Sequence, residues 1–147
     1  MKQKIHAAAG VAAFLIILTF WTSTVLSEIL GTPETIALVK SRILMGMFAL
    51  IPAMVLAGGS GMAIGRRRKD APARAKMKRM PLIAANGVLV LLPAAFFLEA
   101  RASAGNFDIA FIVVQGIELL AGALNLAMMG LNIRDGRRMA ARRKSMA

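Results

Sequence analysis

Four long apolar runs, separated by short polar or basic segments, dominate the hydrophobic pattern of this chain. Uncharged stretches cover Ala7–Ser27, Ile43–Gly65 and Met80–Leu98, and a fourth run, Ile109–Ile133, contains one charged residue, Glu118. Each run reaches the roughly 18–20 apolar residues that a helix needs to cross the hydrocarbon core of a bilayer. The pattern therefore predicts an all-α integral membrane protein with four transmembrane helices.

Capping signals place the ends of these helices. Thr32-Pro33-Glu34 is typical of a helix start, with an N-cap, a proline at the first helical position and an acid in the first turn. Met80-Pro81 is expected to restart the chain at the third helix, and Asn106 or Asp108 to cap the fourth. Arg134-Asp135-Gly136 is expected to end that helix with cations and a glycine.

Short connections between the first and second helices, and between the third and fourth, favour antiparallel hairpins and an up-down four-helix bundle. We expect one membrane domain over residues 1–147. Its transmembrane helices are expected at about 6–29, 36–64, 81–100 and 107–133, with a basic loop at 66–79 and a basic tail at 134–147.

The composition agrees with a membrane domain. The chain has 147 residues, of which 58% are hydrophobic, and its mean hydropathy is +0.66. It contains no cysteine, which excludes structural disulfides, thiolate metal sites and thiol redox chemistry. No metal-ligand cluster, nucleophile–base pair or glycine-rich phosphate loop is evident, so we expect neither a metal site nor an enzyme.

Charge placement predicts the orientation of the bundle. Sixteen of the 19 Lys and Arg residues lie before residue 7, within 66–79 or after residue 133. The positive-inside rule puts these segments, and both termini, in the cytoplasm of a bacterial-type inner membrane. The basic runs lack interleaved aromatic residues, so we expect contact with anionic lipid heads rather than nucleic acid. The first apolar run has no clear cleavage site and is expected to be a retained helix rather than a signal peptide.

The fourth helix carries a polar seam. Glu118, Asn125 and Asn132 are spaced seven residues apart, and Gln115 precedes them on the same face. Such groups are costly in hydrocarbon, so the seam is expected to face the bundle interior. Counting residues along the helices places Glu118 near the membrane centre, and places Asn86 of the third helix at the depth of Asn125.

Two prolines are predicted at the level of Glu118. Pro52 and Pro93 each free a backbone carbonyl about one turn earlier, so they are candidate helix breaks. Three roles for Glu118 stay open: a neutral acid that donates to such a carbonyl, a proton or cation site with Gln115, Asn125 and Asn86 as ligands, and a bond to a partner subunit.

Small residues recur every fourth position in the second helix. This stripe predicts close helix packing, either within the bundle or in an oligomer, and consists of Ala49, Ala53, Ala57, Gly61 and Gly65. Trp21 lies deeper than an interfacial belt position and is expected to stack in the bundle or against a neighbour. Ion pairs are expected at the outer rim among Glu28, Lys40, Arg42, Glu99 and Arg101.

His6 is the one histidine of the chain and the candidate haem ligand. A single histidine forbids bis-histidine ligation within a monomer, and an interfacial polar role is the alternative. The eleven methionines are scattered and are expected to act as flexible packing residues. No cofactor is predicted, with haem and quinone as the alternatives.

The leading functional expectation is a small non-enzymatic accessory or assembly subunit, which docks on other membrane subunits or on itself. Its basis is a compact chain with a small-residue face and almost no extramembrane domain. The first alternative is a proton-coupled carrier of a small solute that uses Glu118. The second alternative is an electron-transfer subunit that binds haem or quinone.

Overall fold

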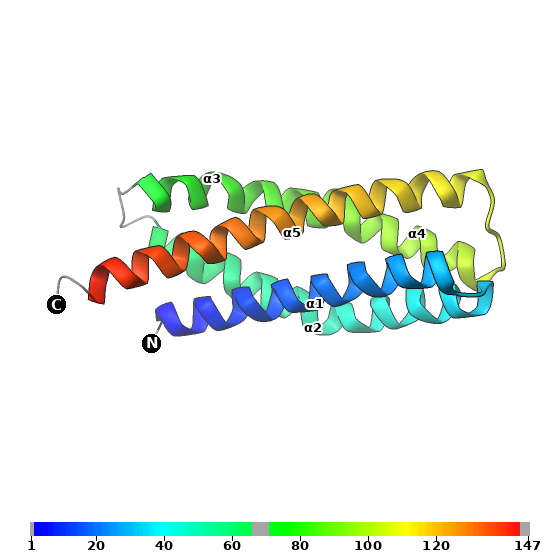
Figure 1. Cartoon of the computed structure of the whole chain (residues 1–147), viewed down its shortest axis with the longest axis horizontal. Coiled ribbons are helices and arrows are strands. Elements are labelled where there is room, and N and C mark those ends of the chain that lie inside the picture. Colours follow the sequence, from blue (N-terminus) through cyan, green and yellow to red (C-terminus); the bar gives the residue numbers. More distant parts are fainter. Residues whose placement is uncertain (1, 66–70, 145–147) are drawn as a thin grey trace.

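The computed structural model describes residues 2–65 and 71–144, and all secondary structure within these ranges is helical. Figure 1 shows the helices as a bundle of long rods that run side by side. The elements in chain order are α1 (Lys2–Leu30), α2 (Pro33–Gly65), α3 (Ala71–Asn86), the π-helix η1 (Gly87–Leu91), α4 (Leu92–Ser103) and α5 (Ile109–Lys144).

Four helices are long and apolar enough to span a membrane, as the apolar runs predicted. The third of them is composite, because α3, η1 and α4 follow one another without a break. The membrane-length segments are Lys4–Leu30, Pro33–Ile64, Arg74–Ser103 and Ile109–Ala141. The prediction of four candidate spans in an all-helical chain is therefore confirmed.

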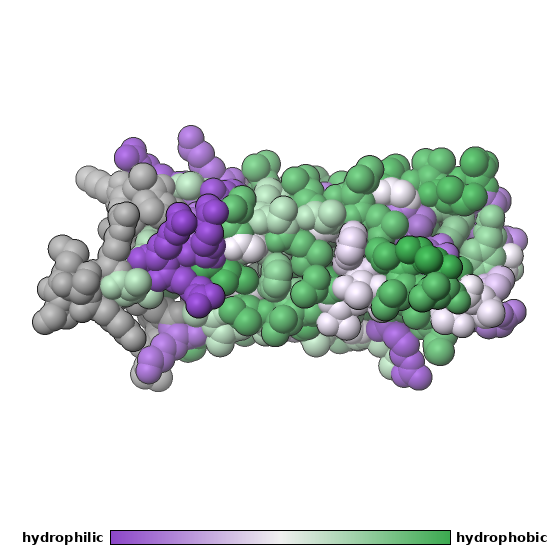
Figure 2. All heavy atoms as spheres, viewed as in Figure 1, coloured by the Kyte–Doolittle hydropathy of each residue, from purple (hydrophilic) through white to green (hydrophobic). Residues whose placement is uncertain are grey.

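The four rods form a closed ring of antiparallel neighbours. Helix α1 packs on α2, α2 packs on α4 and α3, these pack on α5, and α5 returns to α1. The start of α1 and the end of α5 lie together at what we call the terminal end (Figure 1). The connections after Leu30 and Ser103 lie at the opposite end, the loop end. On the face shown in Figure 2, hydrophobic residues fill the middle and hydrophilic residues gather toward the two ends.

Two of the predicted helix starts are confirmed by their capping bonds. The Thr35 amide donates to the Thr32 hydroxyl at 3.4 Å, directly before α2 begins at Pro33. The Phe111 amide donates to Asp108 Oδ1 at 3.0 Å, so Asp108 rather than Asn106 caps α5.

Two expected boundaries are wrong, because both helices extend further toward the terminal end. Helix α3 runs through Pro81 from Ala71, and α5 continues past Gly136 to Lys144. The added segments are rich in Ala, Arg, Lys and Met, which are good helix formers and tolerate one interior glycine. The Arg79 guanidinium also lies 2.7 Å from Asp135 Oδ2, which joins the two extensions.

Two apolar clusters form the core and leave a polar layer between them. The cluster toward the terminal end is built around Ala13, Ile17, Ile83 and Met129. The cluster at the loop end is built around Ile36, Leu98, Ala102 and Phe111. The candidate site lies between these two clusters.

Candidate functional site

A buried ion pair joins the two hairpins below the loop end. Lys40 Nζ of α2 lies 2.8 Å from Glu118 Oε2 of α5, and the Lys40 side chain is 1% exposed. Gln115, one turn before Glu118 on the same helix, donates from Nε2 to that oxygen at 2.9 Å. Glu118 Oε1 accepts no hydrogen bond from the described residues. The carboxylate is therefore held through one oxygen and leaves the other available.

A second carboxylate accompanies this pair. Glu28 of α1 interacts electrostatically with both Lys40 and Glu118. Its Oε1 atom and Oε1 of Gln115 are the two fully buried side-chain polar atoms of the described residues that have no hydrogen-bond partner. Two buried acceptors of the site therefore have no hydrogen-bond donor among the described residues.

The structure corrects two expectations about these residues. Lys40 does not lie at an exposed rim, since its ammonium reaches inward to Glu118. Glu118 is not level with Pro52, because its partner Lys40 precedes Pro52 by twelve residues, about 18 Å along α2. Lys40 is an intrachain partner that none of the three roles left open for Glu118 had named. The depth count was misleading because α5 extends further at the terminal end than the sequence indicated.

The rest of the polar seam faces the bundle interior, as the heptad spacing predicted. Asn86 Nδ2 donates to Asn125 Oδ1 at 3.0 Å and to the Ala121 carbonyl at 2.9 Å. Asn125 is 1% exposed, and Asn132 is also buried. Arg79 Nη1 donates to Asn132 Oδ1 at 3.4 Å. Asn86 and Asn125 thus meet at one depth, but the residues of the seam do not converge on one site.

The two candidate helix breaks behave differently. Helix α2 is continuous through Pro52. Pro93 is the second residue of α4, one residue past the end of η1, and the Leu92 amide between them donates to the Gly87 carbonyl five residues earlier. The wider π turn relieves the clash that a proline ring makes with the carbonyl four residues before it. Only the Pro93 candidate therefore coincides with a change in helix type.

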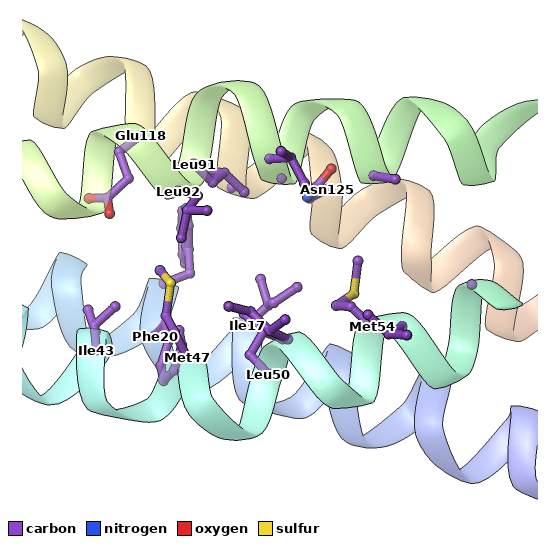
Figure 3. A pocket seen from close by; sticks show the side chains of 18 of the residues that line it. Ile17, Phe20, Ile43, Met47, Leu50, Met54, Leu91, Leu92, Glu118 and Asn125 are labelled. Carbon is purple, nitrogen blue, oxygen red and sulfur yellow. The ribbon is translucent and has the colours of Figure 1, made fainter.

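An apolar cavity of about 380 Å³ lies beside the polar layer. Figure 3 shows it between α1 and α2 on one side and the helices that carry Leu91, Glu118 and Asn125 on the other. Helix α2 packs on α4 and α3 but not on η1 between them. The lining residues Ile51 and Val55 of α2 and Val88 of η1 are exposed, so the cavity opens sideways between α2 and η1.

Polar groups occupy the cavity wall at two levels. Glu118 lies near one end of the labelled lining and Asn125 further along it, with apolar side chains between (Figure 3). Trp21 of α1 also lines the cavity, and its Nε1 donates to the Leu119 carbonyl at 2.9 Å. Gly122 gives the indole room, since a Cβ there would lie 2.9 Å from Trp21 Cδ1. Of the two positions left open for Trp21, in the bundle or against a neighbour, the structure shows contacts within the bundle.

Sequence reasoning missed two features of this site. Lys40 lies before the second uncharged run begins, so it appeared to belong to the rim. The clue was its position seven residues after Pro33, two turns into the helix, where a long side chain reaches the interior. The cavity had no sequence signal, because its lining comes from every rod of the bundle.

The small-residue stripe is used partly inside the bundle. Gly61 is buried beneath Met80 and His6, and Ala53 and Ala57 are half-buried, whereas Ala49 is exposed. Gly65 ends α2, and its surroundings lie outside the described residues. The terminal half of the stripe therefore allows contact among α1, α2 and α3.

His6 has protein partners at both ring nitrogens. Nδ1 lies 3.0 Å from the Ala57 carbonyl oxygen and 3.1 Å from Ser60 Oγ. Nε2 lies 2.7 Å from Lys76 Nζ. The candidate haem ligand is thus engaged in contacts among α1, α2 and α3, away from the cavity.

No known protein family, curated protein or solved structure matches this chain.

Proposed function

We propose that this small membrane protein binds an amphipathic molecule that enters its cavity from the lipid phase, and that it acts as a carrier for that molecule. The observation that carries the proposal is that Glu118, whose Oε1 accepts no hydrogen bond from the described residues, lines a laterally open apolar cavity. Ligand cavities combine an apolar lining with a few placed polar groups, and this cavity has that composition.

The shape of the cavity indicates an elongated ligand. Its lining on α2 extends from Ile43 to Met62, which corresponds to about 28 Å along the helix axis. This length is close to the roughly 30 Å thickness of a bilayer hydrocarbon core. An alkyl or isoprenoid chain fits such a path better than a compact polar solute does, so we narrow the expected small solute to a chain-bearing amphiphile.

Trp21 makes the proposal directly testable. It is the only tryptophan of a chain that has no tyrosine, and it lines the cavity. We would reconstitute the full chain in phosphatidylcholine nanodiscs and titrate 12-bromododecanol, whose bromine quenches tryptophan fluorescence on contact. Saturable quenching is expected, with a midpoint that reflects binding rather than partition into lipid.

A matched pair of glycine substitutions separates the cavity from the bilayer. A Cβ added at Gly58 or at Gly116 would meet no atom within 4 Å, but only Gly58 lines the cavity. Gly58→Leu should abolish the saturable component, while Gly116→Leu should leave it unchanged. Equal quenching in both variants would contradict binding in the cavity.

The carrier part of the proposal predicts movement of the amphiphile between leaflets. Nanodiscs cannot report this movement, so vesicles containing the protein and a fluorescent dodecyl probe in one leaflet are needed. Faster loss of probe from that leaflet in wild type than in Gly58→Leu would support a carrier. Equal rates, with binding intact, would leave a binding protein and exclude transport of this probe.

We propose an N-in and C-in orientation in a bacterial-type inner membrane. The support is the basic character of the terminal end, where His6 meets Lys76 and Arg79 meets Asp135. Cysteines introduced singly at Gly105 and at Met139 would test it, because the native chain has none. Labelling of Gly105→Cys, but not Met139→Cys, by an impermeant maleimide on intact cells is expected.

An accessory subunit is the second candidate. Its support is an exposed surface on α2 where Phe48, 86% exposed, lies beside the exposed Ala49 of the small-residue stripe. Native mass spectrometry of the gently extracted protein would favour this function if additional polypeptides remain bound. A monomer or homo-oligomer that carries a lipid-sized adduct would favour the carrier.

The electron-transfer alternative has less support. Haem ligation by His6 through Nε2 would require loss of its contact with Lys76. A quinone has an apolar chain and a polar head, so it belongs to the class of amphipathic ligands proposed above. The cavity does not favour it over other members of that class. A visible spectrum of the purified protein, with or without a Soret band, separates haem binding from the other functions.

A further inference from the structure

Three side-chain oxygens at and around Glu118 have no hydrogen-bond donor among the described residues: Oε1 of Glu118, of Gln115 and of Glu28. Glu118 Oε2 accepts from Lys40 and Gln115, but Oε1 of the same carboxylate accepts from no described residue. Gln115 is 6% exposed, and its own Oε1 has no partner although its Nε2 bonds to Glu118. Buried acceptors without donors are costly, and Glu118 is the one of these residues that lines the cavity, so it favours a ligand that brings N–H or O–H groups.

The same groups contain two carboxyl groups and one ammonium. When ionised, Glu28 and Glu118 contribute two negative charges against the single positive charge of Lys40. The neighbouring groups of α4 do not reverse this balance. Glu99 accepts from Ser41 at 3.1 Å, and Arg101 is paired with Asp108. In a low-dielectric interior, an unbalanced negative charge attracts a cation strongly.

Resting on the function proposed above, we propose that the ligand of the cavity carries a primary ammonium group. The ammonium hydrogen-bonds to Oε1 of Glu118, and the apolar chain extends along the cavity toward Gly58 and Gly59. A primary ammonium supplies three donors and one positive charge, so it can donate to the oxygen of Glu118 that lacks a donor and pair with its carboxylate charge. A neutral alcohol supplies the donor alone, and a quaternary ammonium supplies the charge alone.

Four probes with the same chain separate these contributions. Dodecylammonium, dodecyltrimethylammonium, dodecanol and dodecyl sulfate would each compete with 12-bromododecanol for quenching of Trp21 in phosphatidylcholine nanodiscs. Nanodiscs with Gly58→Leu serve as the blank for partition into lipid. Dodecylammonium is expected to displace the quencher at a concentration at least about tenfold lower than dodecanol, with the trimethyl compound between them.

Charge-removing variants test which carboxylates confer this preference. Glu118→Gln should remove the tenfold preference for dodecylammonium over dodecanol. Glu118→Gln also breaks the pair with Lys40. Glu28→Gln is therefore the second variant, because it keeps the Lys40–Glu118 pair and removes the second carboxyl group. Glu28→Gln should lower the preference several-fold. Glu34→Gln is the matched control, because this exposed glutamate begins α2 at the same end of the bundle.

Each outcome has a distinct meaning. Equal displacement by dodecanol and dodecylammonium, both abolished by Gly58→Leu, would overturn the ammonium proposal and keep the cavity as a binding site. Displacement of the quencher by dodecyl sulfate at a lower concentration than by the other probes would also overturn it. That result would identify Lys40 as the group that binds the ligand's charge. Quenching that does not depend on Gly58 with any probe would instead refute the proposed function itself.

Discussion

Lys40 Nζ and Glu118 Oε2 lie 2.8 Å apart although 78 residues separate them in the sequence. The bond connects the α1–α2 hairpin to the hairpin that ends in α5, at a depth where Lys40 is 1% exposed. An ammonium this buried requires a carboxylate partner, because burial of an isolated charge costs several kcal/mol. The pair therefore fixes how the two hairpins face each other.

Removal of one member of this pair should destabilise the bundle. Lys40→Met leaves Glu118 without its cation, and breaking a buried pair in this way typically costs about 3–5 kcal/mol. Thermal unfolding in detergent, followed through Trp21 fluorescence, would measure the loss as a lower Tm. Arg42→Met is the control, since Arg42 is exposed on the same helix. The double variant Lys40→Met, Glu118→Met should recover much of the stability, and a double variant as unstable as the single one would contradict this explanation.

The Asn86–Asn125 bond should couple α3 to α5. A double-mutant cycle with Asn86→Ala and Asn125→Ala isolates the interaction from the separate effects of each truncation. Hydrogen bonds between membrane helices average about 0.6 kcal/mol and reach about 1.7 kcal/mol, so a coupling energy in that range is expected. A control cycle combines Asn125→Ala with Asn106→Ala instead of Asn86→Ala. Asn106 is exposed and lies in the connection before α5. Coupling near zero in the Asn86 cycle would show that the 3.0 Å contact does not stabilise the packing.

A single methyl group at Gly122 should displace Trp21. The added Cβ would lie 2.9 Å from the indole Cδ1, so the ring must shift and its bond to the Leu119 carbonyl must lengthen. Overpacking of this kind typically costs about 1–3 kcal/mol. Gly122→Ala should therefore lower Tm and change the Trp21 emission maximum. Gly116→Ala on the same helix has open space and should change neither; an unchanged spectrum in Gly122→Ala would refute this packing.

Asp108 should make the start of α5 sensitive to acid. The hydrogen bond from the Phe111 amide, together with the Arg101 guanidinium, holds the pKa of this carboxyl below its usual value. A lowered pKa means that the carboxylate contributes stability above the pKa of the unfolded chain, and that this contribution is lost as the pH falls through the folded pKa. Asp108→Asn should keep much of the cap and lose the acid sensitivity of local hydrogen exchange at residues 109–112. An identical pH profile in wild type and variant would contradict the assignment.

Several features of the site followed from local sequence patterns. Thr32 was predictable as a cap, and Asp108 as one of two candidates beside Asn106, because a capping bond connects residues only three apart. The interior position of Asn125 followed from the heptad spacing of one helix, because hydrocarbon rejects amides whichever helix faces them. The partner of Asn86 also followed from residue counting. These inferences required no knowledge of how the four rods are arranged around one another.

The partner of Glu118 did not follow in this way. Its identity depends on the rotation of α2 about its axis and on how far each helix extends toward the terminal end. Residue counting placed Glu118 opposite Pro52, whereas the structure places it beside Lys40. The long side chain of Lys40 further weakened the prediction, because its charge and its backbone lie at different depths.

The sequence by itself determined the all-helical class of the protein, the number of membrane-length helices and which face of α5 is buried. Apolar run length and helical periodicity are properties of single segments, so bilayer thickness and the cost of buried polar groups were sufficient to interpret them. Only the tertiary structure decided the Lys40–Glu118 pair, the position of Trp21 over Gly122 and the cavity that opens between α2 and η1. Each of these depends on the distance between helices that are remote in the chain, and side-chain packing sets that distance.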